Sequence, residues 1–100
     1  MANICTNEFY AYSESKENIK YIWDTLSEQF YYCDIYYGSD EEIYATLDSK
    51  WVFPEEFMND LYDNIPNKKS EFYMRCLSYE YGCMYHDLLY CDNDTRWRSA

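Results

Sequence analysis

The spacing of apolar residues alternates along this chain of 100 residues, twice changing from every second residue to about every 3.6 residues and then back. An apolar residue at every second position indicates a β-strand, and the longer period indicates an amphipathic helix. In the first segment, 4–12, the two alternating sets are Cys5, Asn7, Phe9 and Ala11 on one face and Thr6, Glu8, Tyr10 and Tyr12 on the other. The chain is therefore predicted to begin with a strand whose two faces differ.

Two segments have the helical period. The first covers 14–30, with Ser13 as the predicted N-cap. Its buried stripe is predicted to consist of Ile19, Ile22, Trp23, Leu26 and Phe30. The second helix begins at Pro54, a residue favoured at the first helical position, and Pro66 helps to end it. Its apolar stripe consists of Phe57, Met58, Leu61 and Ile65.

The remaining segments are predicted to form strands. The segments 31–37 and 42–49 are rich in tyrosine and isoleucine, and a turn at 38–40 joins them into a hairpin. Because side chains alternate along a strand, each of the pairs Tyr31-Tyr32 and Tyr36-Tyr37 is predicted to place one ring on each face of the sheet. The later elements are strands at 71–79 and 83–91, a turn at 80–82 and a polar tail at 92–100.

The order β-α-β-β-α-β-β predicts an α+β fold. Its first six elements follow the ferredoxin-like plan, an antiparallel sheet with two helices packed on one face, formed by a single domain over 1–100. An all-β fold is disfavoured because two helical stripes are present. The helices are predicted to cover Cys5, Phe9, Ile43, Leu47, Phe72 and Met74. The opposite face is predicted to expose Tyr10, Tyr12, Tyr44 and Tyr73.

The chain is strongly acidic, with eight basic residues against nineteen acidic ones and a net charge of −11. Such a field repels nucleic acid and anionic membranes and attracts basic protein surfaces, although acidity also serves solubility alone. The first twelve residues do not resemble a signal peptide, and no run of apolar residues is long enough to span a membrane. We therefore expect the protein in the host cytoplasm, away from membranes.

Catalytic, metal and cofactor chemistry find little support in the sequence. Cys83, His86 and Cys91 are close in sequence but lack the tight ligand pairs of zinc sites. Either cysteine could pair with His86 as a nucleophile, yet no nucleophile elbow or oxyanion loop accompanies them. A glycine-rich phosphate loop is also missing. We expect no enzyme, no cofactor and no metal.

Direct nucleic-acid binding is an alternative, because ferredoxin-like sheets with exposed aromatic rings can stack bases. On this sheet the exposed face would carry Glu8 and Asp48, with only Arg75 as a positive residue. Phosphate contacts dominate nucleic-acid affinity, and here they would be repulsive. We therefore expect no direct nucleic-acid binding.

Three stretches together resemble a family of small ferredoxin-like proteins carried by phages and other mobile elements. They are Met1-Ala2-Asn3 with Cys5 and Asn7, the segment Leu47-Asp48-Ser49-Lys50-Trp51-Val52-Phe53-Pro54-Glu55-Glu56-Phe57, and Tyr79-Glu80-Tyr81-Gly82-Cys83. The resemblance implies the fold and a mobile-element origin, and it supplies no catalytic residues. The acidic, tyrosine-rich character is also similar to that of small phage inhibitors of bacterial defence, including anti-CRISPR proteins.

The predicted function is therefore a phage or mobile-element inhibitor that occupies the basic groove of a bacterial defence protein or CRISPR effector complex and blocks DNA or RNA binding. Tyrosine is favoured at interfaces, and acids steer a protein toward a basic groove. The predicted partner-binding residues are Asp34, Tyr36, Tyr37, Asp40, Glu41, Glu42, Tyr44, Asp60 and Asp63, with Asp92 and Asp94 adding to the acidic field. The protein would act as a monomer or homodimer. The alternative is a small acidic protein-interaction domain of a mobile element with no inhibitory role.

Overall fold

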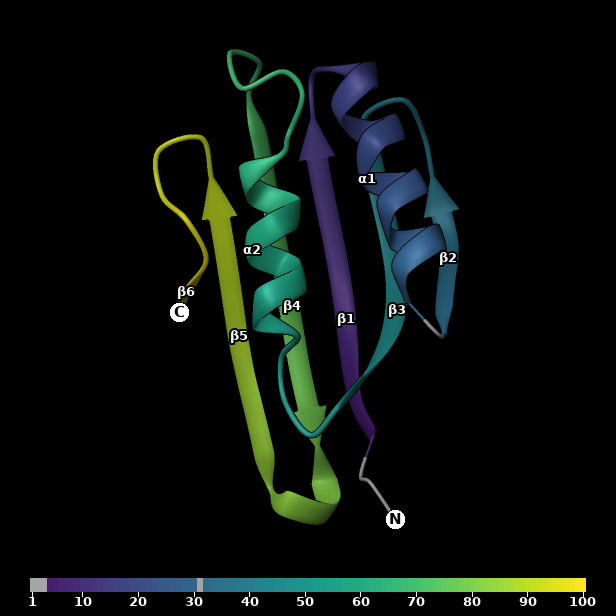
Figure 1. Cartoon of the computed structure of the whole chain (residues 1–100), viewed down its shortest axis with the longest axis vertical. Helices are drawn as coiled ribbons and strands as arrows, with labels where there is room; N and C mark the ends of the chain where they lie inside the picture. Colours follow the sequence, from purple (N-terminus) through teal and green to yellow (C-terminus); the bar gives the residue numbers. More distant parts are fainter. Residues whose placement is uncertain (1–3, 31) are drawn as a thin grey trace.

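A computed structural model describes residues 4–30 and 32–100, except for the side chain of Cys83. The described residues form two α-helices and six strands, an α+β fold (Figure 1). The elements are β1 (Ile4–Ser13), α1 (Lys16–Gln29), β2 (Cys33–Gly38), β3 (Glu42–Lys50), α2 (Glu55–Asp63), β4 (Phe72–Glu80), the 3-10 turn η1 (Tyr81–Cys83), β5 (Tyr85–Asp92) and β6 (Arg98–Ser99). The motif residues Met1-Ala2-Asn3 and the ring of Tyr31 lie outside the described residues.

The strands form one sheet in the order β2-β3-β1-β4-β5-β6, and every described pair is antiparallel. The order of the first four strands is consistent with the predicted ferredoxin-like plan. At the centre of the sheet, Phe9 lies opposite Ala45 on one side and Cys76 on the other. Its neighbour Tyr10, on the opposite face, lies between Tyr44 and Arg75. The predicted alternation of β1 is therefore confirmed.

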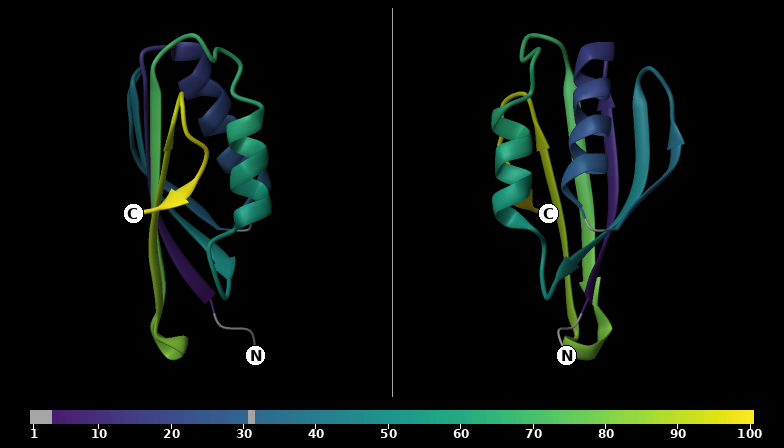
Figure 2. Two further views of the ribbon diagram at one scale, coloured as in Figure 1. Left: turned by 90° about the vertical axis from the view of Figure 1, so that its left-hand side faces the viewer. Right: turned by 45° about the vertical axis from the view of Figure 1, so that its right-hand side comes forward.

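Both helices lie on the same face of the sheet, as predicted, and Figure 2 shows this in its left-hand view. We call this the inner face. The stripe Ile19, Ile22 and Leu26 of α1 is buried against it. The inner-face residues of the strands that complete the core include Phe9, Ala11, Ile43, Ala45, Leu47, Phe72, Met74, Cys76 and Cys91. Burial of these apolar side chains is the main favourable term in folding.

The start of α1 differs from the prediction. Ser15, not Ser13, is the N-cap, and its side chain accepts a hydrogen bond from the Asn18 backbone N–H at 3.2 Å. Ser13 is the buried last residue of β1, and its hydroxyl donates to the Glu71 carbonyl at 2.9 Å. Both serines are acceptable N-caps by type, and the contact of Ser13 with Glu71, the residue before β4, decides between them.

Trp23 was predicted in the buried stripe, but it is 39% exposed. Its ring lies against Gly38 at the end of β2, where a methyl group on the glycine would overlap the ring. No glycine in the described residues has a positive φ, so Gly38 is required by this close approach rather than by a left-handed turn. The side of α1 thus packs on the β2–β3 turn.

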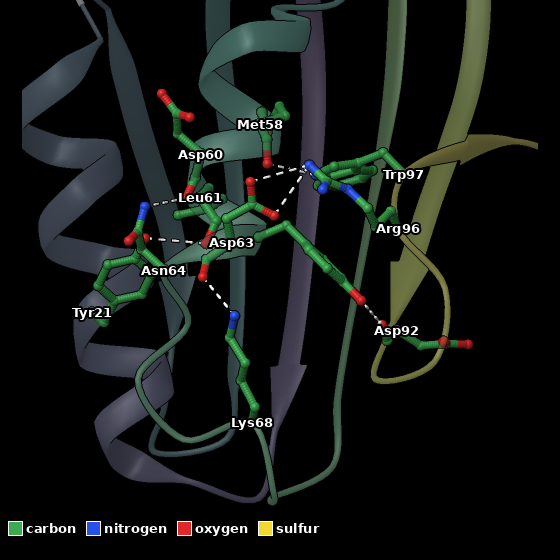
Figure 3. A network of polar contacts seen from close by, with 11 residues as sticks. Tyr21, Met58, Asp60, Leu61, Asp63, Asn64, Lys68, Asp92, Arg96 and Trp97 are labelled. Atoms are coloured by element: carbon green, nitrogen blue, oxygen red, sulfur yellow. Dashed lines mark hydrogen bonds and ion pairs between the residues drawn. The ribbon is translucent and has the colours of Figure 1, made fainter.

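The C-terminal residues, predicted to be a polar tail, are partly built into the fold. Trp97 donates from its indole Nε1 to the Met58 carbonyl of α2 at 2.7 Å (Figure 3). Its ring packs edge-on against Phe53, with 5.4 Å between the ring centroids. Strand β6 then pairs with β5 at Leu89 and Tyr90. The sequence signal for this packing was Trp97, an aromatic residue in a polar segment. Its contacts with Met58 and Phe53 join residues too far apart in sequence to appear in a periodic pattern.

Candidate protein-binding face

The face of the sheet opposite the helices is the candidate site, and we call it the outer face. No helix in the described part of the chain lies over it (Figure 2). Because side chains alternate along a strand, each strand that places one set in the core must place the other set here. In β1, β3 and β4 that second set is rich in tyrosine, and its members include Tyr10, Tyr12, Tyr44, Tyr73 and Tyr79.

Five rings make a continuous group across β2, β3, β1 and β4, which we call the tyrosine cluster. Its members are Tyr10, Tyr36, Tyr37, Tyr44 and Tyr73. The ring of Tyr44 lies 4.8 Å from that of Tyr10, 5.7 Å from Tyr37 and 6.2 Å from Tyr36. These are tilted and edge-on contacts of the kind that aromatic pairs prefer. The rings therefore cover one another on a face over which no helix of the described chain lies.

A bulge in β2 places both Tyr36 and Tyr37 beside Tyr44. The pairing of β2 with β3 skips one residue, because Ile35 lies opposite Ala45 and Tyr37 lies opposite Tyr44. In a β-bulge two residues face one on the neighbouring strand, so the strict alternation of faces is lost. The prediction of one ring on each face was therefore wrong for this pair, and both tyrosines are exposed, at 58% and 50%.

Polar contacts hold the middle of the cluster. The Tyr10 hydroxyl donates a hydrogen bond of 2.7 Å to Oε2 of Glu42, and the Arg75 guanidinium lies 4.4 Å above the Tyr10 ring. Burial, together with the Glu42 carboxylate, raises the pKa of Tyr10 above its ordinary value. Arg75, the one positive residue predicted on this face, is thus held by a ring through a cation–π contact.

Carboxylates gather around Tyr12 at one end of the sheet, and one of them, Glu42, also contacts Tyr10 of the tyrosine cluster. Antiparallel pairing brings the end of β1, the start of β3 and the start of β4 to the same end, and with them the residues that we call the acidic rim, Glu14, Glu41, Glu42 and Glu71. Desolvation and the charges of these four carboxylates raise the pKa of Tyr12, which lies among them. This end of the outer face therefore combines aromatic rings with negative charge.

The structure brings six of the nine predicted partner-binding residues together. The β2–β3 hairpin carries Asp34, Tyr36, Tyr37, Glu41, Glu42 and Tyr44, with Asp34 opposite Thr46 on the outer face. Asp40 lies at the turn but toward α1, where its carboxylate pairs with Lys16 at 3.3 Å. The hairpin is local in sequence, which is why its residues could be grouped from the sequence.

Asp60 and Asp63 lie elsewhere, on α2 in the helix layer (Figure 3). Asp63 forms an ion pair with Arg96 at 3.1 Å, and its carbonyl accepts a hydrogen bond from Lys68 at 2.6 Å. Both aspartates are therefore separated by the sheet from the tyrosine cluster. Both were predicted as partner-binding residues because they are acidic. They do not reach the outer face, because α2 lies on the inner face of the sheet.

Sequence reasoning left out Glu14 and Glu71, which belong to the acidic rim, and did not join Tyr10, Tyr12 and Tyr73 to the predicted site. The strand alternation already placed these three tyrosines on the exposed face. The register between β1 and β4, which sets Tyr12 opposite Tyr73 and Ser13 opposite Phe72, was needed to bring the rest of the rim together. Residues from distant segments meet only through strand pairing.

The residues considered for metal or nucleophilic chemistry do not converge. Cys91 is buried in the core, whereas His86 is exposed and pairs across from Tyr79 on the outer face. Burial raises the pKa of the Cys91 thiol, which disfavours the reactive thiolate. The side chain of Cys83 lies outside the described part, and no group of three potential metal ligands occurs among the side chains that are described.

Within the described ranges, no helix is both long and apolar enough to cross a membrane. A comparison of the chain with protein-family models, with curated proteins and with solved structures finds no match.

Proposed function

We propose that this chain is a protein-binding domain that places its tyrosine cluster and acidic rim on a basic, nucleic-acid-handling surface of a partner and so excludes DNA or RNA. The observation that carries the proposal is the outer face, over which no helix of the described chain lies. There five tyrosine rings form one cluster, and Glu42 of the acidic rim accepts a hydrogen bond from the Tyr10 hydroxyl. Tyrosine gives rigid contact area with a polar end, and the carboxylates steer a basic partner toward it.

The partner that this chemistry suits is a bacterial defence protein or CRISPR effector complex with a basic groove. The net charge of −11 supports attraction to a surface that normally holds phosphates. The resemblance to small mobile-element proteins supplies the biological setting, that of an anti-CRISPR-like inhibitor. The same charge opposes direct binding of nucleic acid by the tyrosine rings.

The proposal is tested on a partner captured from a bacterial lysate with the tagged chain and identified by mass. The purified pair is then measured at low and moderate salt, with and without a nucleic acid competitor. We expect the affinity to fall at least about tenfold between about 50 and 200 mM salt, and nucleic acid to compete for the partner. Salt-insensitive binding without competition would contradict the proposal.

A pair of matched variants locates the contact. Glu41→Lys/Glu71→Lys reverses two exposed carboxylates of the acidic rim, and Glu28→Lys/Asp60→Lys makes the same charge change on the helix layer. The first is expected to weaken binding at least about tenfold and the second far less, because rim charges act locally at moderate salt. Equal losses would show that only the total charge matters, and thermal unfolding verifies that both variants fold.

A second candidate, an interaction domain without an inhibitory role, is favoured by a different observation. Three of the eight basic residues already pair with acids inside the chain, as Lys16–Asp40, Lys20–Asp24 and Arg96–Asp63. Part of the acidity thus serves the protein's own surface. This candidate predicts that the captured partner binds without competing with nucleic acid.

A further inference from the structure

A second feature of the outer face lies at the end opposite the acidic rim, where β4, η1 and β5 form a hairpin (Figure 1). An open groove there has a volume of about 530 Å³, and its exposed lining is mostly apolar. We call it the hairpin groove. The residues that line it include Glu8, Leu77, Tyr79, Tyr81, Met84 and His86.

The apolar side chains around the hairpin groove are unusually exposed. Met84 is 89% exposed and Tyr81 is 81% exposed, and Leu88, opposite Leu77 in the β4–β5 register, is 40% exposed. The rings of Tyr79 and Tyr81 lie 5.1 Å apart. Large apolar side chains gathered at one exposed place indicate an interaction site, whereas single ones do not.

Backbone strain accompanies this exposure. Met84 has a φ of 54°, in the left-handed region that residues other than glycine and asparagine rarely adopt. The one other non-glycine residue of the described chain with a positive φ is Trp51, at 70°, which follows β3 at the same end of the sheet and is 46% exposed. The left-handed backbone at Met84 therefore holds its exposed apolar side chain at a cost in folding free energy, at the edge of the groove.

One carboxylate, that of Glu8, stands beside His86 in the lining of the groove and favours an occupant that carries a cation. Glu8 lines the groove and lies opposite Leu77 in the β1–β4 register. Burial and the Glu8 carboxylate raise the pKa of Tyr79, so the carboxylate acts at the groove itself. A second copy of this chain would bring another −11 charges to the same surface, which disfavours self-association. The complementary occupant is an apolar side chain that has a cation beside it.

We propose that the hairpin groove binds an apolar side chain flanked by lysine or arginine on the partner protein, with Glu8 facing the cation. This inference rests on the proposed function, because a basic partner supplies the cation. The acidic rim and the hairpin groove lie at opposite ends of one face, so the rim steers the partner while the groove anchors it. A buried apolar anchor of this kind commonly dominates the binding energy of an interface.

The test uses the full chain and three short peptides, acetyl-Arg-Phe-Arg-amide, acetyl-Arg-Ser-Arg-amide and acetyl-Gln-Phe-Gln-amide, titrated to millimolar concentration. NMR follows the methyl groups of Met84 and Leu77. We expect saturable shifts with Arg-Phe-Arg and at least about threefold weaker binding of the other two peptides, since each lacks one half of the recognised pair.

Two matched variants each replace one exposed apolar side chain and preserve the left-handed backbone conformation at that position. Asparagine tolerates the left-handed region, so Met84→Asn and Trp51→Asn both preserve the turn and remove an exposed apolar group. We expect Met84→Asn to weaken Arg-Phe-Arg about fivefold and Trp51→Asn, outside the groove, to leave it unchanged. Glu8→Gln should weaken Arg-Phe-Arg about threefold without affecting Gln-Phe-Gln.

The inference would be overturned if Arg-Ser-Arg or Gln-Phe-Gln bound as tightly as Arg-Phe-Arg, or if the methyl shifts did not saturate. Methyl shifts that change with protein concentration in the absence of peptide would also overturn it, because they would show that a second copy of the chain occupies the groove. Glu41→Lys/Glu71→Lys separates the two proposals. If this rim variant binds Arg-Phe-Arg as the wild type does while Met84→Asn does not, the groove proposal is supported, even if the wild-type chain fails to compete with nucleic acid. If the rim variant competes poorly with nucleic acid while Met84→Asn and Glu8→Gln bind Arg-Phe-Arg as the wild type does, the proposed function is supported and the groove proposal is wrong.

Discussion

The two faces of the sheet are built from the same strands but are completed in different ways. On the inner face, Phe9, Met74 and Leu47 are buried under two helices. On the outer face, Tyr10, Tyr44 and Tyr73 remain partly exposed and contact one another. One alternating pattern thus produced both a core and an aromatic surface over which no described helix lies. Alternate residues of one strand therefore divide two tasks: the inner set stabilises the fold, and the outer set stays available for contacts.

The largest difference between the two faces is expected when one ring is removed from each. Phe9→Ala should lower the free energy of unfolding by about 3–5 kcal/mol, because it leaves a cavity beneath the helices. Tyr44→Ala removes ring contacts at the surface and should cost only about 1 kcal/mol. Urea denaturation of both variants measures the difference. Equal losses would mean that the outer rings are as essential to the fold as the core.

A second prediction concerns the polar part of the inner face. The buried Asn7 side chain donates to the Leu47 carbonyl at 3.1 Å and to the Ser49 hydroxyl at 2.9 Å, and it accepts from the Ser78 hydroxyl at 2.6 Å. Asn7→Ala should cost about 2–3 kcal/mol, because it leaves buried partners unsatisfied. The control Asn7→Ala/Ser78→Ala should cost less than the sum of the single variants. Strict additivity, again from denaturant curves, would remove Asn7 from this role.

A third prediction tests the contact between the helix layer and the β2–β3 hairpin. Gly38→Ala should lower the unfolding free energy by about 1–2 kcal/mol, since the added methyl group overlaps the Trp23 ring. In a Trp23→Ala background the same change should be nearly neutral, because the ring is gone. Thermal unfolding of the four proteins measures the coupling. A cost that persists without Trp23 would locate the requirement for glycine in the turn instead.

The smallest effect is expected on the outer face as pH rises. The pKa of Tyr10 is raised in the folded protein, above 10.0 in the unfolded chain. Its contribution to stability is therefore complete below pH 10 and is lost as pH increases further, because the unfolded chain then releases the proton more readily. Tyr10→Phe should cost less than about 1 kcal/mol at neutral pH and should flatten the alkaline decline. Denaturation at neutral and alkaline pH measures both, and an unchanged decline would rule out Tyr10 as a contributor.

Local patterns were enough to predict much of the fold. The alternation in β1, the two helices and the hairpin at 31–49 depend on neighbouring residues. Each is confirmed in type and approximate position, although Trp23 of the predicted α1 stripe is exposed. The same local reasoning grouped the hairpin residues of the candidate site, because a hairpin brings together residues that are close in sequence.

The errors have a common origin in contacts between distant residues. Ser13 is held by Glu71, Trp23 by Gly38 and Trp97 by Met58, and none of these partners is visible in a periodic pattern. The bulge at Tyr36 is another case, since a skipped residue in strand pairing has no counterpart in alternation.

The order of elements, the acidic charge and the presence of a second, tyrosine-rich face could be predicted before the fold was known, because each follows from residue type and spacing along the chain. Which acids share that face depends instead on how distant segments pack. The strand register brought Glu14 and Glu71 to the rim, while the position of α2 removed Asp60 and Asp63 to the other side. The hairpin groove likewise required β1, β4 and β5 to lie side by side, because its walls come from segments about seventy residues apart.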